Sequence, residues 1–498
     1  MTTPMGRGNS SRALAAAAAA LAFLLAGCAS TGGLHTDASL RSADQLAADK
    51  ALGQTPLDPA LWPAQNWWTG FGDPQLDQLI NEALKDSPSL KAAAARVRHA
   101  AALANETDAA RSPRVDSSLS ATRERFSANG LIPPPFAGGW GTLGEVQGTL
   151  SWDLDVWGKN RAAFEQALGQ ERAAEVDAQA VKLALSSSIA HAYVQLMRGY
   201  QQLDVAQATV EQRERTLALT QDRNAAGIDS KLELKQAEAA VPAAREQVAQ
   251  WDERIALAHD QIAALMGQGP DRGIAIERPA AMTGRQLEAG ALPSRVPSQL
   301  LGRRPDVVAQ RWRVEAARRG IDVAKARFYP DVNLTAFIGF QSLGGSSLLA
   351  LENREAGVGP ALSLPLFDAG ERRAQLAGAD AQYDEAVEQY NQTLADALRE
   401  VVDQLDILRS VSHQRIEEQQ ALSSSREAYD LALLRYREGV GNYLQVLSAE
   451  APLLEQEGLE VDLRARALDA SIELDRALGG GLEPAAPLAS VSRDSGSR

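Results

Sequence analysis

One residue of this chain is placed for covalent chemistry. Cys28 is the only cysteine of the 498 residues, and Leu25, Ala26 and Gly27 precede it. A cysteine thiolate can be alkylated by a lipid, and small residues before it leave room for a signal peptidase to cut. A lipidated Cys28 leaves no thiol for a disulfide or for other cysteine chemistry. We therefore predict that Cys28 is a lipidation site.

The segment before Cys28 is typical of an export signal. Two arginines precede an unbroken apolar run over residues 13–25, which is too short to span a bilayer. The pattern resembles a bacterial lipobox, which implies that residues 1–27 are a signal peptide and that Cys28 carries S-diacylglycerol and an N-acyl chain. Several buried chains hold a protein firmly on a membrane. By resemblance to bacterial sorting rules, Ala29 favours the outer membrane over the inner one.

Other residue types that could carry chemistry do not converge on a site. The five histidines are scattered, and no zinc-protease, nucleophile-elbow, paired-cysteine or phosphate-loop pattern occurs. Five methionines and one cysteine provide no path for a soft metal. The formal charge of -14 argues against nucleic acid as a partner, because a phosphate-binding surface needs clustered Lys and Arg. We expect no enzyme activity, no metal and no cofactor besides the covalent lipid.

The chain contains an internal repeat. A block without gaps pairs Pro88 with Pro305, Arg96 with Arg313, and Pro113 with Pro330. A second block, at an offset about five residues shorter, pairs Arg223 with Arg435, Gly227 with Gly439, and Glu238 with Glu450. Matches at two fixed offsets indicate that one structural unit occurs twice.

Each half predicts a pair of strands. Residues 145–156 and 332–340 alternate with period two, so that one face is apolar and the other polar. We place β-hairpins at about 114–157 and 331–367. An antiparallel sheet on a soluble core is the alternative. Strands of about a dozen residues, near the span of a tilted membrane strand, and the scarcity of aromatic residues for a core favour strands that cross a membrane.

A very long helix follows each strand pair. No proline interrupts these stretches, which predicts helices from Gly158 to about Ala225 and from Gly370 to about Arg437. Roughly 67 residues rise about 100 Å, more than a globular domain accommodates. Their Ala, Glu, Gln, Arg and Leu are strong helix formers with a narrow apolar stripe, as in coiled-coil-like packing. A coiled-coil stalk is the alternative.

Each long helix ends at a glycine, Gly227 or Gly439, which is a natural turn position. A return helix follows, so that helical hairpins span residues 158–267 and 370–478. Each return helix contains one proline, at which we expect a bend or a lost hydrogen bond. We hypothesise that such a bend near the turn allows this end of the helical hairpins to close.

These elements predict five segments and a mode of assembly. The segments are a signal peptide at 1–27, a lipidated and loosely ordered linker at 28–65, a first repeat at 66–270, a second repeat at 271–480 and a flexible tail at 481–498. Four strands cannot close a barrel, yet every backbone polar group in lipid must be paired. Three copies would supply twelve strands around a water-filled lumen. We therefore predict a mixed α and β membrane protein, a trimeric outer-membrane β-barrel continued by a long helical periplasmic barrel.

Several motifs carry a resemblance to a known family. They are Trp67-Trp68, the stretch Trp152 to Lys159, the stretch Leu301 to Val307, the stretch Val323 to Pro330 and the stretch Arg435 to Leu444. Together with the lipobox and the repeat, from about Asn66 to Gly480, they resemble the NodT and OprM type lipoproteins of the TolC-like outer membrane factor family. The resemblance implies a homotrimer that serves as the exit duct of a tripartite efflux pump, with a periplasmic adaptor and an RND-type inner-membrane transporter. A protein-secretion duct of the same fold and a stalk that conducts nothing are the alternatives.

The resemblance also implies where a gate lies. Members of that family close their periplasmic tips through contacts between helices and through acidic rings. Here Gln445 and Ser448 occupy the positions where it implies carboxylates. Because rings of Asp or Glu favour cations, the implied cation selectivity is in question for this chain.

Charged and aromatic residues near the turns are further gate candidates. Asp229, Glu233 and Glu450 are predicted to line the constriction, with solvated surface carboxylates as the alternative. Arg435 and Tyr436 are predicted to make the contacts between subunits that hold the tip closed, with plain packing as the alternative. The sequence does not indicate which compounds pass.

Overall fold

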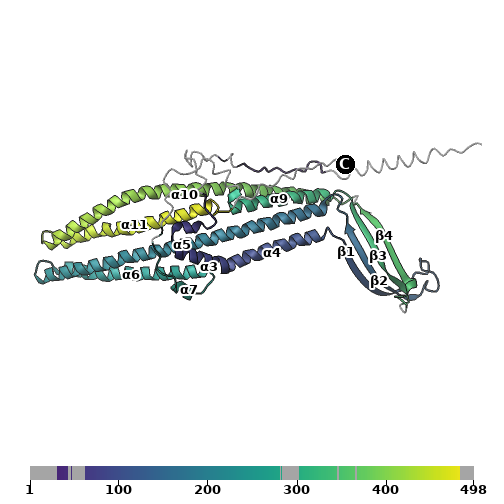
Figure 1. The fold of residues 1–498 in the computed structure, drawn as a ribbon, viewed down its shortest axis with the longest axis horizontal. Coiled ribbons are helices and arrows are strands. Elements are labelled where there is room, and N and C mark those ends of the chain that lie inside the picture. Colours follow the sequence, from purple (N-terminus) through teal and green to yellow (C-terminus); the bar gives the residue numbers. More distant parts are fainter. Residues whose placement is uncertain are drawn as a thin grey trace, which may run out of the picture. The chain divides into compact units, whose positions relative to one another are not determined.

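The computed structural model describes most of the chain (Figure 1). The described residues are 31–42, 46, 62–280, 282, 302–344, 347–364 and 367–482. The predicted signal peptide, the predicted lipidation site Cys28 and residues 483–498 of the predicted tail lie outside them. Within the described ranges, no helix is both long enough and apolar enough to cross a membrane.

The chain forms two compact units that do not coincide with the two repeats. One unit comprises Met1–Leu40, Val97–Ala174 and Gln310–Tyr390, and the other comprises Arg41–Arg96, Glu175–Ala309 and Asn391–Arg498. Each unit takes segments from both halves of the sequence. The repeats are therefore not two separately folded domains, because each gives a β-hairpin to one unit and a helical hairpin to the other.

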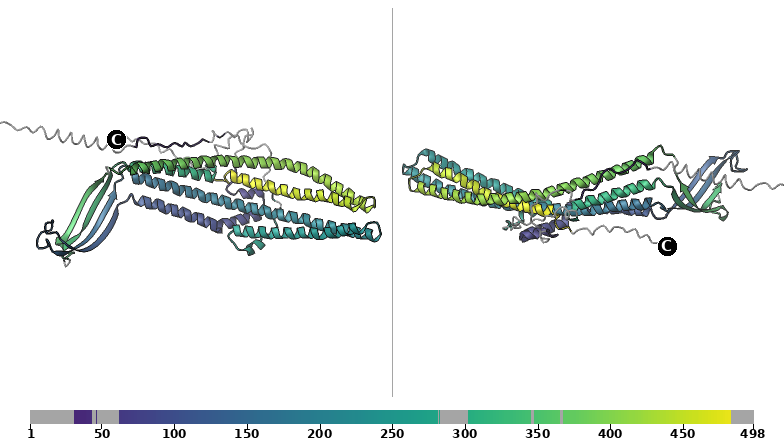
Figure 2. Two further views of the ribbon diagram at one scale, coloured as in Figure 1. Left: turned by 180° about the vertical axis from the view of Figure 1, so that it is seen from behind. Right: turned by 90° about the horizontal axis from the view of Figure 1, so that it is seen from above.

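The first unit contains a four-stranded antiparallel sheet (Figure 2). Its strands are β1 (Arg114–Arg125), β2 (Trp140–Asp153), β3 (Asp331–Leu343) and β4 (Arg354–Ser363). The order is β1-β2-β3-β4, so β2 and β3 join the hairpins of the two repeats. In the described part of the chain no further strand covers the outer edges of β1 and β4.

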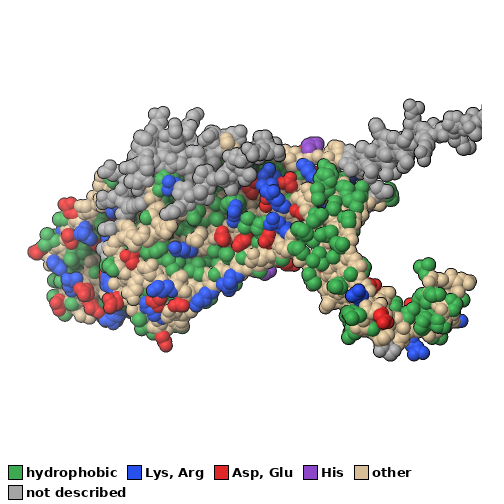
Figure 3. All heavy atoms as spheres, turned by 45° about the vertical axis from the view of Figure 1, so that its right-hand side comes forward, with side chains coloured by type: hydrophobic (Ala, Val, Ile, Leu, Met, Phe, Trp, Pro, Cys, Tyr) green, Lys and Arg blue, Asp and Glu red, His purple; other side chains and the backbone are tan. Residues whose placement is uncertain are grey.

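The register places most of the apolar positions of the four strands on one face, whereas Leu143, Phe337 and Leu343 lie on the other. The aligned rows include Val115, Leu150, Ala336 and Val358, and also Leu119, Val146 and Phe340. This face is open, since Val358 is 76% exposed, and Figure 3 shows hydrophobic side chains gathered over the strands. The other face is mainly polar, and there Gln147 Nε2 donates to Glu355 Oε1 over 3.4 Å. The predicted alternation is confirmed.

β2 ends earlier than its alternation predicts. The pattern continues to Val156, but the strand ends at Asp153. Asp155 has a φ of 45°, in the left-handed region, which turns the chain out of the strand. Its carboxylate accepts hydrogen bonds from the backbone N–H groups of Asn160 and Arg161, both over 2.8 Å. These bonds satisfy two of the donors that the start of a helix leaves unpaired.

The helices follow the repeat. They are η3 (Trp67–Phe71), α3 (Pro74–Asp86), α4 (Pro88–Ala109), α5 (Lys159–Ala225), α6 (Lys231–Leu265), α7 (Pro270–Ile274), α9 (Pro305–Ala326), η4 (Leu351–Asn353), α10 (Glu371–Arg437) and α11 (Tyr443–Ala477). The long helices α5 and α10 have 67 residues each, and the return helices α6 and α11 have 35 each. The two halves thus produce helical hairpins of equal length, as the sequence predicts.

The return helices are continuous through their prolines. Pro242 lies inside α6 and Pro452 lies inside α11. The cost at each site is the one N–H hydrogen bond that proline cannot make. No interruption of the helix marks a hinge at either proline.

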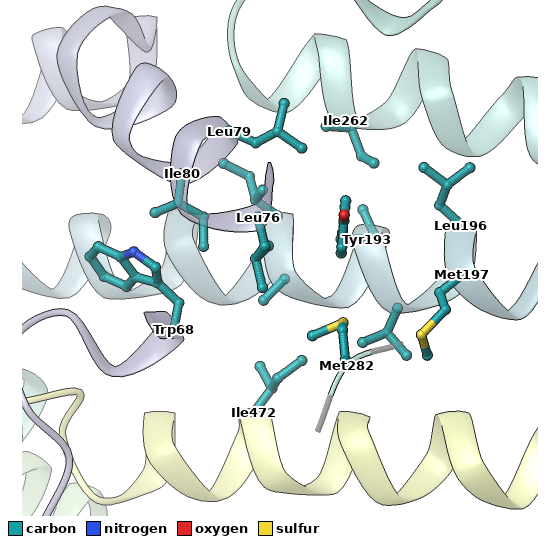
Figure 4. Close-up of a cluster of buried hydrophobic side chains, with 14 of the residues drawn as sticks. Trp68, Leu76, Leu79, Ile80, Tyr193, Leu196, Met197, Ile262, Met282 and Ile472 are labelled. Carbon is teal, nitrogen blue, oxygen red and sulfur yellow. The ribbon is translucent and has the colours of Figure 1, made fainter. Parts of the chain in front are cut away.

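A core of aromatic and aliphatic side chains fills the second unit (Figure 4). It includes Trp67, Trp68, Phe71, Leu76, Leu79, Ile80, Tyr193, Leu196, Ile262 and Ile472. Asp73 begins α3, because its carboxylate accepts the Gln75 N–H over 2.9 Å. The buried Tyr193 hydroxyl donates to the same carboxylate over 2.8 Å. The Trp67-Trp68 motif and the stretch from Phe71 to Pro74 that follows it therefore supply core side chains and a helix cap.

Part of the predicted linker is bound along α10. The backbone N–H of Ala38 donates to Asp384 Oδ1 over 2.9 Å, and that of Asp37 donates to the same carboxylate over 3.2 Å. Leu34 packs against a cluster that includes Leu376. The expectation of a loosely ordered linker is wrong for residues 31–42, because paired N–H groups and an apolar contact attach the segment to the helix.

Candidate functional site at the helical hairpin turns

The candidate site consists of the turns that join α5 to α6 and α10 to α11. Gly227 and Gly439 have φ values of 74° and 77°, in the left-handed region that favours glycine after a helix. Ser230 and Asn442 begin the return helices, and each side chain accepts a hydrogen bond from the backbone of the helix that it starts. The two turns therefore use the same local devices at equivalent positions.

Arg223, Asp229 and Tyr436 form a buried cluster that joins the two hairpins. Arg223 Nε lies 2.9 Å from Asp229 Oδ2, and the two side chains are only 9% and 8% exposed. The Tyr436 hydroxyl donates to the same carboxylate over 2.5 Å. Arg223 Nη1 donates to the Tyr436 carbonyl over 2.8 Å, and the guanidinium lies 4.3 Å from the centre of the Tyr436 ring. One carboxylate is thus satisfied by donors from both hairpins.

The cluster holds its carboxylate ionised. Burial alone raises the pKa of Asp229, but hydrogen bonds from Arg223 and Tyr436 and the charge of the guanidinium bring it below its ordinary value. Burial, together with the hydrogen bond to Asp229, raises the pKa of Tyr436 to about 12. At neutral pH the cluster is therefore an anion, a cation and a neutral phenol, which is the arrangement that its hydrogen bonds require.

Glu450 of α11 is also turned inward. The residue is buried, Gln212 Nε2 donates to its Oε1 over 3.1 Å, and Arg213 Nε lies 3.5 Å from the same oxygen. Glu450 and Asp229 are therefore used in contacts with α5 of their own chain. Neither is a solvated surface carboxylate, and neither is presented at the protomer surface for lining a pore.

Glu233 caps its own helix. The Ser230 N–H donates to Glu233 Oε2 over 2.9 Å, and the two side chains complete a capping box. Hydrogen bonding from Ser230 lowers the pKa of Glu233. Whether Glu233 also lines the constriction stays a prediction.

Arg435, Gln445 and Ser448 are exposed. Ser448 Oγ donates to the Leu444 carbonyl over 2.8 Å. Within the described residues, the Arg435 side chain has no hydrogen-bond or ion-pair partner. The structure brings Arg435 and Gln445 close together at the second turn, and their roles at a gate stay predictions.

A polar seam between α5 and α11 was not predicted. Its pairs are His191 with Asp469 and Glu473, Gln195 with Asp469, Arg198 with Asp462, and Gln202 with Asp462. In each pair α5 supplies the donor and α11 the carboxylate. The sequence signal is the spacing of three or four residues on each helix, but nothing in a repeat alignment shows that these two helices face each other.

His191 is the most strongly perturbed group of this seam. Its Nδ1 lies 2.8 Å from Asp469 Oδ1 and its Nε2 lies 2.7 Å from Glu473 Oε1. Burial lowers the pKa of the ring, but the hydrogen bonds and charges of the two carboxylates outweigh burial and raise the pKa of His191 to about 9. At neutral pH an imidazolium therefore ties α5 to α11.

Each turn also exposes two large apolar side chains. Ile228 and Leu232 lie at the first turn, and Val440 and Leu444 lie at the second, all of them largely exposed. The pairs occupy equivalent positions of the repeat. Exposed apolar side chains grouped on hairpin ends are typical of protein contact surfaces.

The family of the chain follows from comparison with known proteins. The model of the family described as "Outer membrane efflux protein" matches residues 79–268 and 296–480, which are most of the chain. The chain belongs to this family. The match covers both repeats, and so both of the β-hairpins and both of the helical hairpins described above.

Curated outer membrane efflux proteins and solved structures agree with this assignment. The chain is 41% identical to the fusaric acid resistance protein FusA of Burkholderia cepacia over 388 residues, covering 76% of this chain and 71% of FusA. It is 31% identical over 430 residues to the multidrug resistance outer membrane protein MdtP of Escherichia coli K12, covering 85% of this chain and 87% of MdtP. The crystal structure of the outer membrane protein VceC from Vibrio cholerae matches with a TM-score of 0.79 and 39% identity, covering 85% of this chain and all of that one. The outer-membrane channel OprN matches with a TM-score of 0.79 and 28% identity, covering 91% of this chain and 99% of that one.

Membership in this family establishes what kind of protein the chain is. Outer membrane efflux proteins are passive trimeric channels of the outer membrane of Gram-negative bacteria, so this chain is a channel subunit of an efflux system and not an enzyme. Each chain contributes its four strands to the β-barrel and its long helices to the helical barrel of the channel. The predicted family, fold class and activity are confirmed.

Proposed function

We propose that this channel is the exit duct of a tripartite system whose other parts are a periplasmic adaptor protein and an RND-type inner-membrane transporter. The proposal is supported by the exposed apolar pairs at the hairpin turns. Ile228 and Leu232, and equally Val440 and Leu444, offer a partner the same contact twice in each chain. Burial of such side chains against an adaptor would contribute about 25 cal/mol per Å² of apolar surface.

Complementation of a deletion strain tests this function. The wild-type gene is expected to restore tolerance to dyes and antibiotics, and Leu444→Asp is expected to fail although the trimer still forms and conducts. Ile274→Asp is the matched control, because Ile274 is also exposed but lies in α7, away from both turns. Equal loss in both variants would remove the turns from adaptor docking. Restored export of a protein without restored tolerance to compounds would favour a protein-secretion duct instead.

We further propose that the mature chain begins at Cys28 and is held on the outer membrane by lipid on that residue. The proposal is supported by the Leu25 to Cys28 motif and the export signal before it. Mass spectrometry of the purified protein is expected to show a chain that lacks residues 1–27 and carries acyl groups on Cys28. A Cys28→Ser variant is expected to keep its signal peptide or to lose its lipid. An unacylated mature chain would contradict the anchor.

A further inference from the structure

The two hairpin turns differ in charge although their backbones match. The first turn carries Asp229, Lys231, Glu233 and Lys235, and the equivalent residues of the second are Gly441, Tyr443, Gln445 and Leu447. No charged residue occurs from Gly439 to Ala449. The arginine before the turn is nevertheless present in both, as Arg223 and Arg435. The second turn thus has the cation of the first without its carboxylate.

The two arginines have opposite environments. Arg223 is buried in its ion pair with Asp229, whereas Arg435 is exposed and without a partner among the described residues. Gly441 stands where Asp229 does, and a Cβ there would lie 3.1 Å from Arg435 Cβ and 3.1 Å from Gln445 Oε1. The second turn is therefore too tight at this position for an equivalent of Asp229 without a shift of its neighbours.

No carboxylate of the described residues forms an ion pair with Arg435, and Glu233 of the first turn is accompanied by Lys231 two residues before it. The adjoining Arg437 and Glu438 offset each other in formal charge. The inward carboxylate Glu450 is paired with Arg213. A guanidinium stays protonated across the physiological pH range, so a permanent positive charge lies next to Gln445.

We propose that Arg435 makes the tip of this channel selective for anions, so that anionic solutes are the class of compound that it passes best. The proposal rests on the proposed function, in which three copies surround one opening with their hairpin turns. Three symmetry-related guanidinium groups then form a ring, which attracts anions and repels cations at a constriction. Gln445, beside Arg435, carries no carboxylate to reverse that sign.

Reversal potentials of the purified trimer in planar bilayers, measured across a potassium chloride gradient, test the proposal. The wild type is expected to favour chloride over potassium, and Arg435→Gln is expected to lose that preference while it still conducts. Arg437→Gln is the matched control, because it removes an equal exposed charge two residues away, about 200° around the helix, and it is expected to keep the preference. Gln445→Glu is expected to shift permeability toward potassium.

The outcomes separate this proposal from the function on which it rests. A wild type that conducts but favours potassium would overturn anion selectivity and leave the channel intact. An Arg435→Gln variant with raised conductance and an unchanged permeability ratio would assign Arg435 to contacts that hold the tip closed, and would also overturn the proposal. The absence of any conductance would instead contradict the proposed duct.

Discussion

Arg245 Nη2 lies 2.6 Å from Glu214 Oε1, and this ion pair recurs in the second repeat with its charges exchanged. There, Arg426 Nη2 lies 2.7 Å from Glu457 Oε1. Glu214 and Arg426 are equivalent positions of the repeat, as are Arg245 and Glu457. Each pair joins a long helix to its own return helix, whereas an exchange of return helices would bring like charges together. The pairs therefore favour correct matching of the two hairpins.

Reversal of one charge in the first hairpin is expected to weaken it slightly. Glu214→Arg places an arginine next to Arg245, so the two side chains repel. The second change, Arg245→Glu, restores an ion pair, with the cation on the long helix as in the second hairpin. Because both side chains are substantially exposed, the coupling is expected to be below about 1 kcal/mol. A double-mutant cycle on the free energy of unfolding measures it. A double variant no more stable than Glu214→Arg would show that the pair has no such role.

Removal of the buried carboxylate at the turns is expected to cost much more. Asp229→Asn leaves Arg223 buried without its anion, which destabilises by about 3–5 kcal/mol. Tyr436→Phe removes the hydroxyl that hydrogen-bonds to both Asp229 and Thr220, and is expected to cost about 1–3 kcal/mol. Both loosen the contact between the hairpins, so limited proteolysis at the turns should accelerate, and more in Asp229→Asn. Cleavage of both variants at the rate of the wild type would contradict a clamp made of Arg223, Asp229 and Tyr436.

The seam between α5 and α11 is expected to respond to alkaline pH. The pKa of His191 is raised from an unfolded value of about 6.5 to about 9 in the fold. The stability from this shift is therefore fully present below the unfolded value and is lost as pH rises through about 9. His191→Gln is expected to cost on the order of 3 kcal/mol at low pH and to flatten the decline of stability between pH 7 and 9. Parallel stability profiles of the two proteins would contradict the imidazolium bridge.

The apolar face of the sheet is expected to reject charge. Val358→Arg places a cation on that face, which costs about 2–4 kcal/mol if the position lies near the middle of the bilayer. Gly359→Arg is the matched control on the polar face, since nothing lies within 4 Å of the Cβ that it would add. Folding into lipid vesicles, followed by trimer bands on gels, is expected to fail or slow only for Val358→Arg. Equal insertion of both variants would contradict a lipid-facing role.

The sequence predicted those parts of the fold that depend on local rules. Long stretches without proline gave α5 and α10, and period-two alternation gave the strands and their apolar face. The end of β2 was missed because the left-handed turn at Asp155 interrupts an alternation that continues to Val156. Asp155 in the motif before the long helix was a signal that could have placed this end, because its carboxylate caps α5.

The partners within the site could not be predicted in the same way. The repeat alignment shows that Arg223 and Arg435 are equivalent positions, but it does not show that Arg223 contacts Asp229 and Tyr436 in the fold. Such contacts depend on which helices pack together across the two halves. The same limit applies to the bound segment 31–42, whose hydrogen bonds to Asp384 involve residues more than 300 positions away.

The central claim is that β1 of one chain is completed by β4 of a sister chain, and cross-linking tests it most directly. Ser118→Cys in β1 and Gly359→Cys in β4 lie on the polar face. Within one chain they are three strand spacings apart across the sheet and four residues apart along the strands, about 20 Å in all. With Cys28 used by lipid, a thiol reagent shorter than this span is expected to link different chains and to give dimers and trimers but nothing larger. A chain that stays monomeric after cross-linking in native membranes would contradict the account.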